Sequence, residues 1–428
     1  MTQSIRRVAV VGSVRIPFCR SNTLLIDQTN LDMLTATLGG LVDRYDLKGV
    51  HIDEVTGGAV VTHSRDWNIA REAVIGSRLA PSTPGITMMQ ACGTSLQAAG
   101  GIAAKIAIGA IECGIAMGSD TTSDPPLVVG KKLATRLRDA SLQKTTMAKL
   151  GVFKGFAPSE LSPLPPSVAE PRTGLSMGQH CELMAKQWSI GRAEQDQLAY
   201  ESHAKAAAAY REGWFDDLVA PFAGVFRDNN VREDTTTEKL AQLKPAFDRS
   251  AAGTLTAGNS TPLTDGAASV LLASEGWAAE RGLKPLAWLT HVETAANDFV
   301  AGDGLLMAPT IAVARMLKRA GLKLQDFDHY EIHEAFAAQV LCTLKAWEDP
   351  AYCRDKLGLA EPLGEICRTR MNVKGSSIAV GHPFASTGAR IVGNLAKLLH
   401  VNGGRGLISI CTAGGMGVAA IMESADAL

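Results

Sequence analysis

The 428-residue sequence has little of several features that mark particular protein classes. Aromatic residues make up only 5% of the chain and the formal net charge is -1, so no long-range field favours a nucleic-acid or acidic-membrane partner. The eight cysteines include no Cys-x-x-Cys pair, which leaves zinc-ribbon and thioredoxin-like sites without support. The longest uncharged stretch, roughly residues 79–104, contains two prolines and is not a candidate transmembrane helix.

A long apolar run is also missing near the N-terminus. Val8–Val11 is too short for the hydrophobic region of a signal peptide and predicts a first β-strand instead. Scattered cysteines in a chain without such a signal are typical of a reducing compartment, so we expect a cytoplasmic protein. In that compartment most cysteines are buried thiols, and an unusual one can be catalytic.

The sequence does contain an α/β pattern that is interrupted in the middle. Short apolar runs alternate with helical patterns up to about residue 122, and the alternation resumes after about residue 250. Prolines, a basic helix-like segment at Lys131–Lys154 and a charged helix at Arg192–Arg211 lie between. Because the chain is too long for one ordinary core, we expect an α/β half at 1–122, an inserted loop domain at 123–250, the end of the first half at 251–282 and a second α/β half at 283–428.

Cys92 is a candidate nucleophile. It is followed by Gly93 and by a run of small residues typical of a closely packed helix. A thiol at the first turn of a helix faces free N–H groups and the helix dipole, which lower its pKa and raise its thiolate fraction. A buried structural cysteine in a small-residue interface explains the same pattern.

Two histidines lie where strands or turns lead into helices. His333 follows the predicted strand His329–Ile332, at the end where α/β folds place ligand chemistry. His382 lies between Gly381 and Pro383, which restrict the backbone on both sides. The alternatives are a helix-capping residue for His333 and a surface residue for His382.

Cys411 ends the predicted strand Leu407–Ile410 and opens a glycine-rich turn. Glycine permits close backbone approach and positive φ, so this turn could present N–H groups to an anion. An ordinary hairpin turn before Val418–Met422, with Cys411 as a core thiol, is the alternative. Two cysteines and two histidines, each at an element end shaped by Gly or Pro, together indicate a catalytic site.

In their order and spacing these segments resemble the thiolase family, over nearly the whole chain. The matching stretches are Cys92-Gly93-Thr94-Ser95, residues 253–260 with Asp265-Gly266-Ala267-Ala268, His333-Glu334-Ala335-Phe336, Gly381-His382-Pro383, and Cys411 with its glycines. The resemblance implies an α/β thiolase fold. Two similar βαβαβαββ halves would form a layered α/β/α/β/α core, with an inserted loop domain.

Several positions resemble one branch of this family. His333 stands where most thiolases have Asn, whereas the β subunits of trifunctional fatty-acid oxidation complexes and their bacterial relatives have His. Phe384 and Leu305–Pro309 also resemble that branch. Ser176 departs from the family, because a His often precedes the Met-Gly pair there and makes a pantetheine contact. The resemblance implies a 3-ketoacyl-CoA thiolase of β-oxidation, the alternative being a biosynthetic acetyl-CoA C-acetyltransferase that makes acetoacetyl-CoA.

The resemblance also implies a role for each site residue. Cys92 would attack the 3-keto carbon and carry the acyl group, with His382 taking its proton, and Cys411 would protonate the leaving acetyl-CoA enolate. His333 and His382 would hold the thioester oxygen, and the backbone N–H groups of Cys92 and Ala413 would form a second oxyanion hole. The residues expected to contact acyl-CoA or CoA are Met177, Arg232, Ala257, Ser260, Thr261 and Phe336.

Further expectations concern cofactors and partners. By resemblance CoA is a substrate, no cofactor or metal is required, and the chain forms a homodimer or a dimer of dimers. A hydratase/dehydrogenase α chain could bind Lys131–Lys154, which can equally be a solvated lid. A decarboxylating condensing enzyme, a CoA or lipid carrier without turnover, and a Cys–His hydrolase stay open; the second cysteine, Cys411, favours a thiolase over the first and the last.

Overall fold

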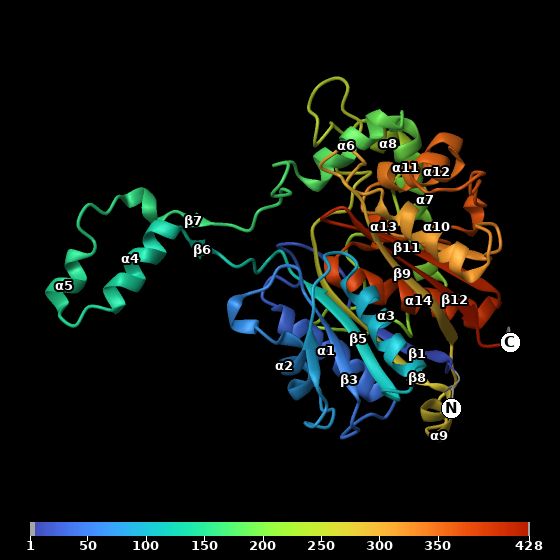
Figure 1. The fold of residues 1–428 in the computed structure, drawn as a ribbon, viewed down its shortest axis with the longest axis horizontal. Coiled ribbons are helices and arrows are strands. Elements are labelled where there is room, and N and C mark those ends of the chain that lie inside the picture. Colours follow the sequence, from blue (N-terminus) through green and yellow to red (C-terminus); the bar gives the residue numbers. More distant parts are fainter. Residues whose placement is uncertain (1–4, 427–428) are drawn as a thin grey trace.

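A sheet built from two halves runs through the molecule, which a computed structural model describes for residues 5–426 (Figure 1). The first half contains β1 (Val8–Arg15), β3 (Glu54–Gly58), β4 (Gly85–Thr87), β5 (Cys113–Asp120) and β8 (Thr264–Ser274), with β2 (Cys19–Arg20) beside β8. The second half contains β9 (Ala287–Ala296), β10 (His329–Ile332), β11 (Arg405–Thr412) and β12 (Met416–Ser424). Pairing of Ala9 with Trp288 and of Val10 with Ala287 joins the halves through β1 and β9.

Helices form three layers around the two half sheets. The first half is covered on its outer face by α1 (Asn30–Arg44) and α2 (Ile69–Gly76), and the second by α10 (Ala308–Ala320) with α11 (Ala337–Glu348) beside it. The central layer consists of α3 (Thr94–Ala107) and α14 (Thr387–Asn402), which contact each other and both halves. Apolar clusters fill the gaps between the layers. The predicted α/β/α/β/α layering is therefore confirmed.

The two halves follow nearly the same strand order. The first half has the complete predicted pattern βαβαβαββ, whereas in residues 5–426 the second half lacks one regular strand. In its place Met371 forms a single parallel bridge with Tyr330. Asn372 then turns the chain away with φ of 47°, and its side-chain amide bonds to both the N–H and the C=O of Ile332 at 2.9 Å. One side chain thus satisfies the backbone groups that a longer strand would pair.

The segment between β5 and β8 has two parts. One is a hairpin that projects from the body (Figure 1) and comprises β6 (Val128–Val129), α4 (Lys131–Ser141), α5 (Thr146–Gly151) and β7 (Pro163–Leu164). The other comprises α6 (Met177–Gln187), α7 (Arg192–Arg211) and α8 (Thr237–Ala241), and it packs against α11 and against α13 (Ser377–Val380). The predicted boundaries at 122, 250 and 282 lie in connections between elements. No helix within residues 5–426 has the length and apolar character needed to span a membrane.

The closest approach of α3 and α14 positions the candidate site. A Cβ atom on Gly388 would lie 2.3 Å from the backbone nitrogen of Leu96, so only glycine fits there. Nearby, Ala389 N–H donates to Ser95 Oγ at 2.8 Å. The N-terminal ends of the two central helices therefore meet, and with them the residues that precede each helix, Cys92 and His382.

Candidate active site

Cys92 lies in a tight turn just before α3. Ala91 has φ of 45°, unusual for a residue with a Cβ atom. Thr94 Oγ1 holds the turn, since it accepts from Gln90 N–H at 2.8 Å and donates to Ala91 C=O at 2.7 Å. Gly93 is the N-cap and the helix begins at Thr94. Cys92 therefore lies just before the first helical turn, whereas the sequence predicts it within that turn. The strained turn directs the thiol toward the centre of the molecule.

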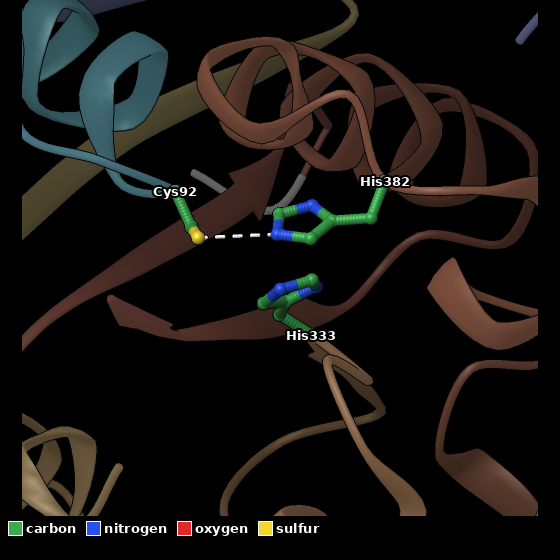
Figure 2. Close-up of side chains that lie close together, drawn as sticks. All are labelled: Cys92, His333 and His382. Carbon is green, nitrogen blue, oxygen red and sulfur yellow. Dashed lines mark hydrogen bonds between the residues drawn. The ribbon is translucent and has the colours of Figure 1, made fainter. Parts of the chain in front are cut away.

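His382 reaches Cys92 from the second half of the fold. Gly381 has φ of 105°, and a Cβ atom there would lie 2.8 Å from Thr264 Cγ2. His382 N–H donates to Thr264 Oγ1 at 2.8 Å, which fixes the backbone. The ring then places Nε2 at 3.1 Å from Cys92 Sγ and Nδ1 at 2.5 Å from Thr387 Oγ1 (Figure 2). If Nδ1 carries the proton and donates to Thr387, Nε2 is free to accept the proton of the thiol.

His333 lies against His382. The ring centroids are 4.1 Å apart at an interplanar angle of 50° (Figure 2), and ring nitrogens of both histidines lie within 4.8 Å of one another and of Cys92 Sγ. His333 Nδ1 is 2.7 Å from Ser377 Oγ, whereas the buried Nε2 has no partner among the described residues. Burial lowers the pKa of His333 well below 6.5 and that of His382 to about 3, so both rings are neutral. An uncharged donor, Nε2–H of His333, can therefore face a bound oxygen atom.

Glu334 follows His333 and lies outside any helix, so His333 does not cap one. The following helix, α11, begins only at Ala337. Glu334 is buried and accepts from Ser202 Oγ and from Asn372 Nδ2, each at 2.7 Å. It thus ties the strand end that carries His333 to α7 of the insertion.

The environment of Cys92 contradicts the expected low thiol pKa. Burial raises the pKa of Cys92 to about 12, and the Asp120 carboxylate adds to the increase. The N–H groups of Ala413 and of Cys92 itself act in the opposite direction but are outweighed. The helix dipole favours the thiolate, but desolvation is the larger effect at this buried position. The resting site consequently holds a neutral thiol beside a neutral imidazole.

Cys411 and Ala413 approach the Cys92 thiol from the β11–β12 hairpin. Cys411 is buried, and burial together with the nearby Cys92 raises its pKa well above 9.0. The Ala413 N–H points to the Cys92 sulfur. The turn is an ordinary hairpin, as the alternative reading has it, with φ of 77° and 68° at Gly414 and Gly415. Cys411 nevertheless shares the surroundings of Cys92, so the hairpin and the site coexist.

The residues expected to contact CoA separate into two groups and one residue, Thr261, that joins neither. Arg232, Ala257 and Ser260 line one small cavity, and the buried Ser260 Oγ has no partner among the described residues. Thr261 does not line it and instead bonds to Ala335 C=O through both its N–H and its hydroxyl at 3.1 Å. Met177 and Phe336 also lie elsewhere, in the apolar cluster of the second half.

Sequence reasoning missed two residues near these groups. Arg20 lines the same cavity as Arg232, and burial with the nearby Arg232 charge lowers its pKa. Phe247 contacts Phe336 with ring centroids 5.8 Å apart and nearly perpendicular. Neither residue belongs to a motif, and each meets its partner only through the fold. Ser176, the departure from the family pattern, caps α6 by accepting from Gln179 N–H.

Two family descriptions match the chain, "Thiolase, N-terminal domain" over residues 8–276 and "Thiolase, C-terminal domain" over residues 283–424. The chain is 41% identical to a curated 3-ketoacyl-CoA thiolase of Photobacterium profundum, covering 99% of this chain and 98% of the relative. A 3-ketoacyl-CoA thiolase of Klebsiella pneumoniae is likewise 41% identical, with the same coverage.

Solved structures resemble the chain over its full length. The acetyl-CoA acetyltransferase of Bacillus anthracis has a TM-score of 0.81 and 30% identity, covering 99% of this chain and 100% of that one. Human mitochondrial 3-ketoacyl-CoA thiolase has a TM-score of 0.80 and 27% identity, covering 98% and 99%. Both TM-scores show that the chain shares its overall fold with these two proteins.

Proposed function

The chain belongs to the thiolase family, and from this premise we propose that it cleaves 3-ketoacyl-CoA with CoA, giving acetyl-CoA and a shortened acyl-CoA in fatty-acid β-oxidation. It is an acyltransferase. The observation that carries the proposal is the 3.1 Å contact between Cys92 Sγ and His382 Nε2 in a buried site beside His333. A neutral thiol paired with a neutral base can form an acyl thioester while water is excluded.

In the first step the Cys92 sulfur attacks the 3-keto carbon, and its proton passes to His382 Nε2. Since burial disfavours a free thiolate, we expect proton transfer to accompany attack rather than to precede it. Negative charge develops on the former keto oxygen. The N–H groups of Cys92 and Ala413 are in place to receive it.

In the second step the carbonyl re-forms as the Cys92 thioester and the C2–C3 bond breaks. Its electron pair moves to the thioester group of the leaving acetyl-CoA, whose oxygen is held by His333 and His382. Cys411 gives its proton to C2 and becomes a thiolate. CoA then returns a proton to Cys411 and attacks the acyl group, and the released Cys92 sulfur recovers its proton from His382.

The two groups of residues around the site contact different parts of the substrate, one the CoA moiety and the other the acyl chain. Arg20 and Arg232 face one cavity, where two cations suit the phosphates of CoA. The unpartnered Ser260 hydroxyl in the same cavity suits an amide of the pantetheine arm. Met177 and Phe336, with Phe247 beside them, offer apolar surface for the acyl chain. Ala257 also lines the cavity of Arg232, and Thr261 fixes the backbone next to Ser260 through its two bonds to Ala335 C=O.

The function is tested by trapping the acyl-enzyme. Incubating the protein with a long-chain 3-ketoacyl-CoA in the absence of CoA should add the shortened acyl group to the peptide containing Cys92, as read by mass spectrometry. Cys92→Ala should lose both the adduct and thiolysis, and turnover retained in this variant would contradict the mechanism. Activity confined to four-carbon substrates would instead favour acetyl-CoA C-acetyltransferase activity, which the name of the Bacillus anthracis neighbour carries.

No cofactor or metal is part of the proposal. The sulfur and ring nitrogens of Cys92, His333 and His382 are close enough to hold a metal ion. The mechanism instead uses the Sγ–Nε2 contact as a hydrogen bond for proton transfer. Dialysis against a chelator should therefore leave thiolysis unchanged, and loss of activity restored by added zinc would contradict this assignment.

We also propose a homodimer, or a dimer of such dimers, in a reducing cytoplasm. Strand β4 stands at one end of the sheet order for residues 5–426, and Ile86 and Met89 near it expose apolar side chains. A second copy could pair with this edge. All eight cysteines are free, and the reaction needs two of them reduced. Light scattering should show a dimer or tetramer that Ile86→Lys shifts toward the monomer.

A partner chain is proposed for the projecting hairpin. α4 and α5 expose apolar side chains at Leu137, Leu142, Met147 and Leu150, interspersed with lysines and arginines. Arg136 keeps the hairpin folded through Glu160 and the carbonyl of Val152. Exposed apolar surface with basic residues fits an apolar groove with an acidic rim on a hydratase/dehydrogenase α chain.

A further inference from the structure

A line of buried polar groups leads to His333 from α14. Arg390 Nη2 donates to Ser377 Oγ at 2.6 Å, and Ser377 Oγ lies 2.7 Å from His333 Nδ1. Arg390 Nη1 also donates to Ser376 Oγ at 3.3 Å. Arg390, Ser377 and His333 are each buried, with exposed fractions of 5%, 0% and 0%. Neither Ser377 nor Arg390 is among the groups that react in the proposed mechanism.

The direction of these hydrogen bonds follows from the donor capacity of each group. An arginine side chain only donates, so Ser377 Oγ is the acceptor in its bond with Arg390. The Ser377 hydroxyl proton then has one acceptor within reach among the described residues, His333 Nδ1. Nδ1 accepts this proton, and the ring proton of a neutral imidazole must therefore sit on Nε2.

The opposite tautomer is disfavoured by unsatisfied groups. With the proton on Nδ1, His333 would donate to Ser377, and the Ser377 hydroxyl would be left without an acceptor in a fully buried position. Nε2, which already lacks a partner, would then present a lone pair to the site. A lone pair would repel the negative oxygen that His333 has to hold.

We propose that Ser377 and Arg390 are positioning residues that fix His333 in the tautomer with its proton on Nε2, so that this N–H donates to the thioester oxygen of the leaving acetyl-CoA. The inference rests on the thiolase function proposed above. It explains why a cation is buried at this point. Among residues 5–426 Arg390 forms no ion pair, and its side-chain hydrogen bonds are those to Ser376 and Ser377.

The neutral state of His333 is what makes its tautomer matter. Burial is the main cause that lowers the pKa of His333 well below 6.5, and the neighbouring His382 and Arg390 act in the same direction. Burial also lowers the pKa of Arg390, to about 10, with Glu331 acting in the opposite direction. Arg390 therefore stays a charged hydrogen-bond donor at neutral pH. The neutral His333 ring has a single N–H proton, which can sit on either Nδ1 or Nε2. His382 needs the opposite arrangement and receives it from Thr387, which faces its Nδ1.

The test combines spectroscopy with a double-mutant cycle. In the dimer or tetramer labelled with ¹⁵N-histidine, the NMR signals of His333 are identified by their absence from His333→Asn. Their ¹⁵N chemical shifts should show that the ring proton is on Nε2. In Ser377→Ala these signals should shift toward a mixture of tautomers. A proton on Nδ1 of His333 in the unmodified protein would overturn the proposal, whatever the thiolysis rates of the variants are.

Kinetics give the second readout. Ser377→Ala should lower kcat roughly 10- to 100-fold with a small change in KM, and Ser377→Thr, which keeps the hydroxyl, should restore most of the rate. In a His333→Asn background the amide N–H2 needs no tautomer control, so adding Ser377→Ala should change the rate less than about twofold. Equal losses in both backgrounds would mean that Ser377 is merely structural. Acyl-Cys92 trapping in the unmodified protein tests the proposed function separately, so that function stands even if this inference fails.

Discussion

At the scale of single residues, both histidines of the site contact a hydroxyl group through Nδ1 but need different tautomers. His382 must carry its proton on Nδ1, and His333 must carry it on Nε2. Nδ1 of His382 faces Thr387 and Nδ1 of His333 faces Ser377, in each case within 2.7 Å. Thr387 can accept a proton, whereas Ser377 is already an acceptor for Arg390 and must donate. Two similar hydroxyl contacts thus produce one base and one donor.

The proton path between Cys92 and His382 predicts the reactivity of the thiol. Replacing His382 with Ala should slow alkylation of Cys92 by iodoacetamide at pH 7 by roughly 100-fold, because the buried thiol has lost its base. Peptide mapping of the alkylated protein measures this rate. Cys367 is an exposed control in the same sample, since Thr369 lowers its pKa and His382 is not its neighbour. Unchanged labelling of Cys92 would rule out His382 as the base.

Burial of His333 predicts a pH dependence of stability. In the native state its pKa lies well below 6.5, whereas the unfolded chain takes up a proton as the pH falls through about 6.5. Stability is therefore lost on acidification below pH 6.5, by up to about 1.4 kcal/mol per pH unit for one proton. Asp120 and Glu331, each with its pKa raised to about 7 by burial, act in the opposite direction.

His333→Asn isolates the histidine contribution from these carboxyl groups. The variant should lose less stability than the unmodified protein between pH 6.5 and 5, as measured by urea unfolding at each pH. His400→Asn, which changes an exposed histidine of α14, should follow the unmodified protein. Parallel curves for all three proteins would show that His333 gains its proton in the native state as readily as in the unfolded chain.

At the scale of elements, the crossing of α3 and α14 controls the distance between Cys92 and His382. Gly388→Ala places a Cβ atom against the backbone of Leu96, which cannot move without shifting α3. We expect a loss of about 1–3 kcal/mol in stability and a larger fall in kcat than in substrate affinity. Thermal unfolding and thiolysis assays measure the two effects.

Gly101 provides the matched control in the same pair of helices. A Cβ atom there meets nothing within 4 Å, so Gly101→Ala should leave activity unchanged and add up to about 1 kcal/mol of helix stability. If both variants behave alike, the close approach at Gly388 does not position the site.

The sequence predicts secondary-structure elements and motif positions well. It predicts poorly the pKa values and contacts that arise only when these elements are buried against one another. The strand His329–Ile332 and the helix Arg192–Arg211 were predicted with the bounds that the structure has. The low pKa expected for Cys92 is wrong, because desolvation depends on residues from both halves of the fold. Ser377 lies four residues before the Gly381-His382-Pro383 motif. Its partner His333 is 44 residues away, so no local pattern identifies the contact.

At the scale of the whole molecule, the projecting hairpin is expected to serve association rather than catalysis. In β6 and β7, Val129 pairs with Pro163, so residues 130–162 can be replaced by an Asn-Gly turn without moving the ends. The shortened protein should keep its thiolysis rate within about twofold and lose co-purification with a hydratase/dehydrogenase chain. Retained co-purification would show that the partner chain binds another surface. Loss of thiolysis would show that the hairpin contributes to the substrate site.

The place of β8 in the sheet has a consequence for synthesis of the chain. β8 lies between β1 and β5, pairing Val8 with Ser274 and Cys113 with Ala273. During translation the ribosome must therefore deliver the whole insertion before the first sheet can close. Until residue 274 emerges, β1 and β5 keep unpaired edges, which are the surfaces through which nascent chains aggregate. The insertion, which interrupts the first half in sequence, thus also sets how long the unfinished chain exposes these edges.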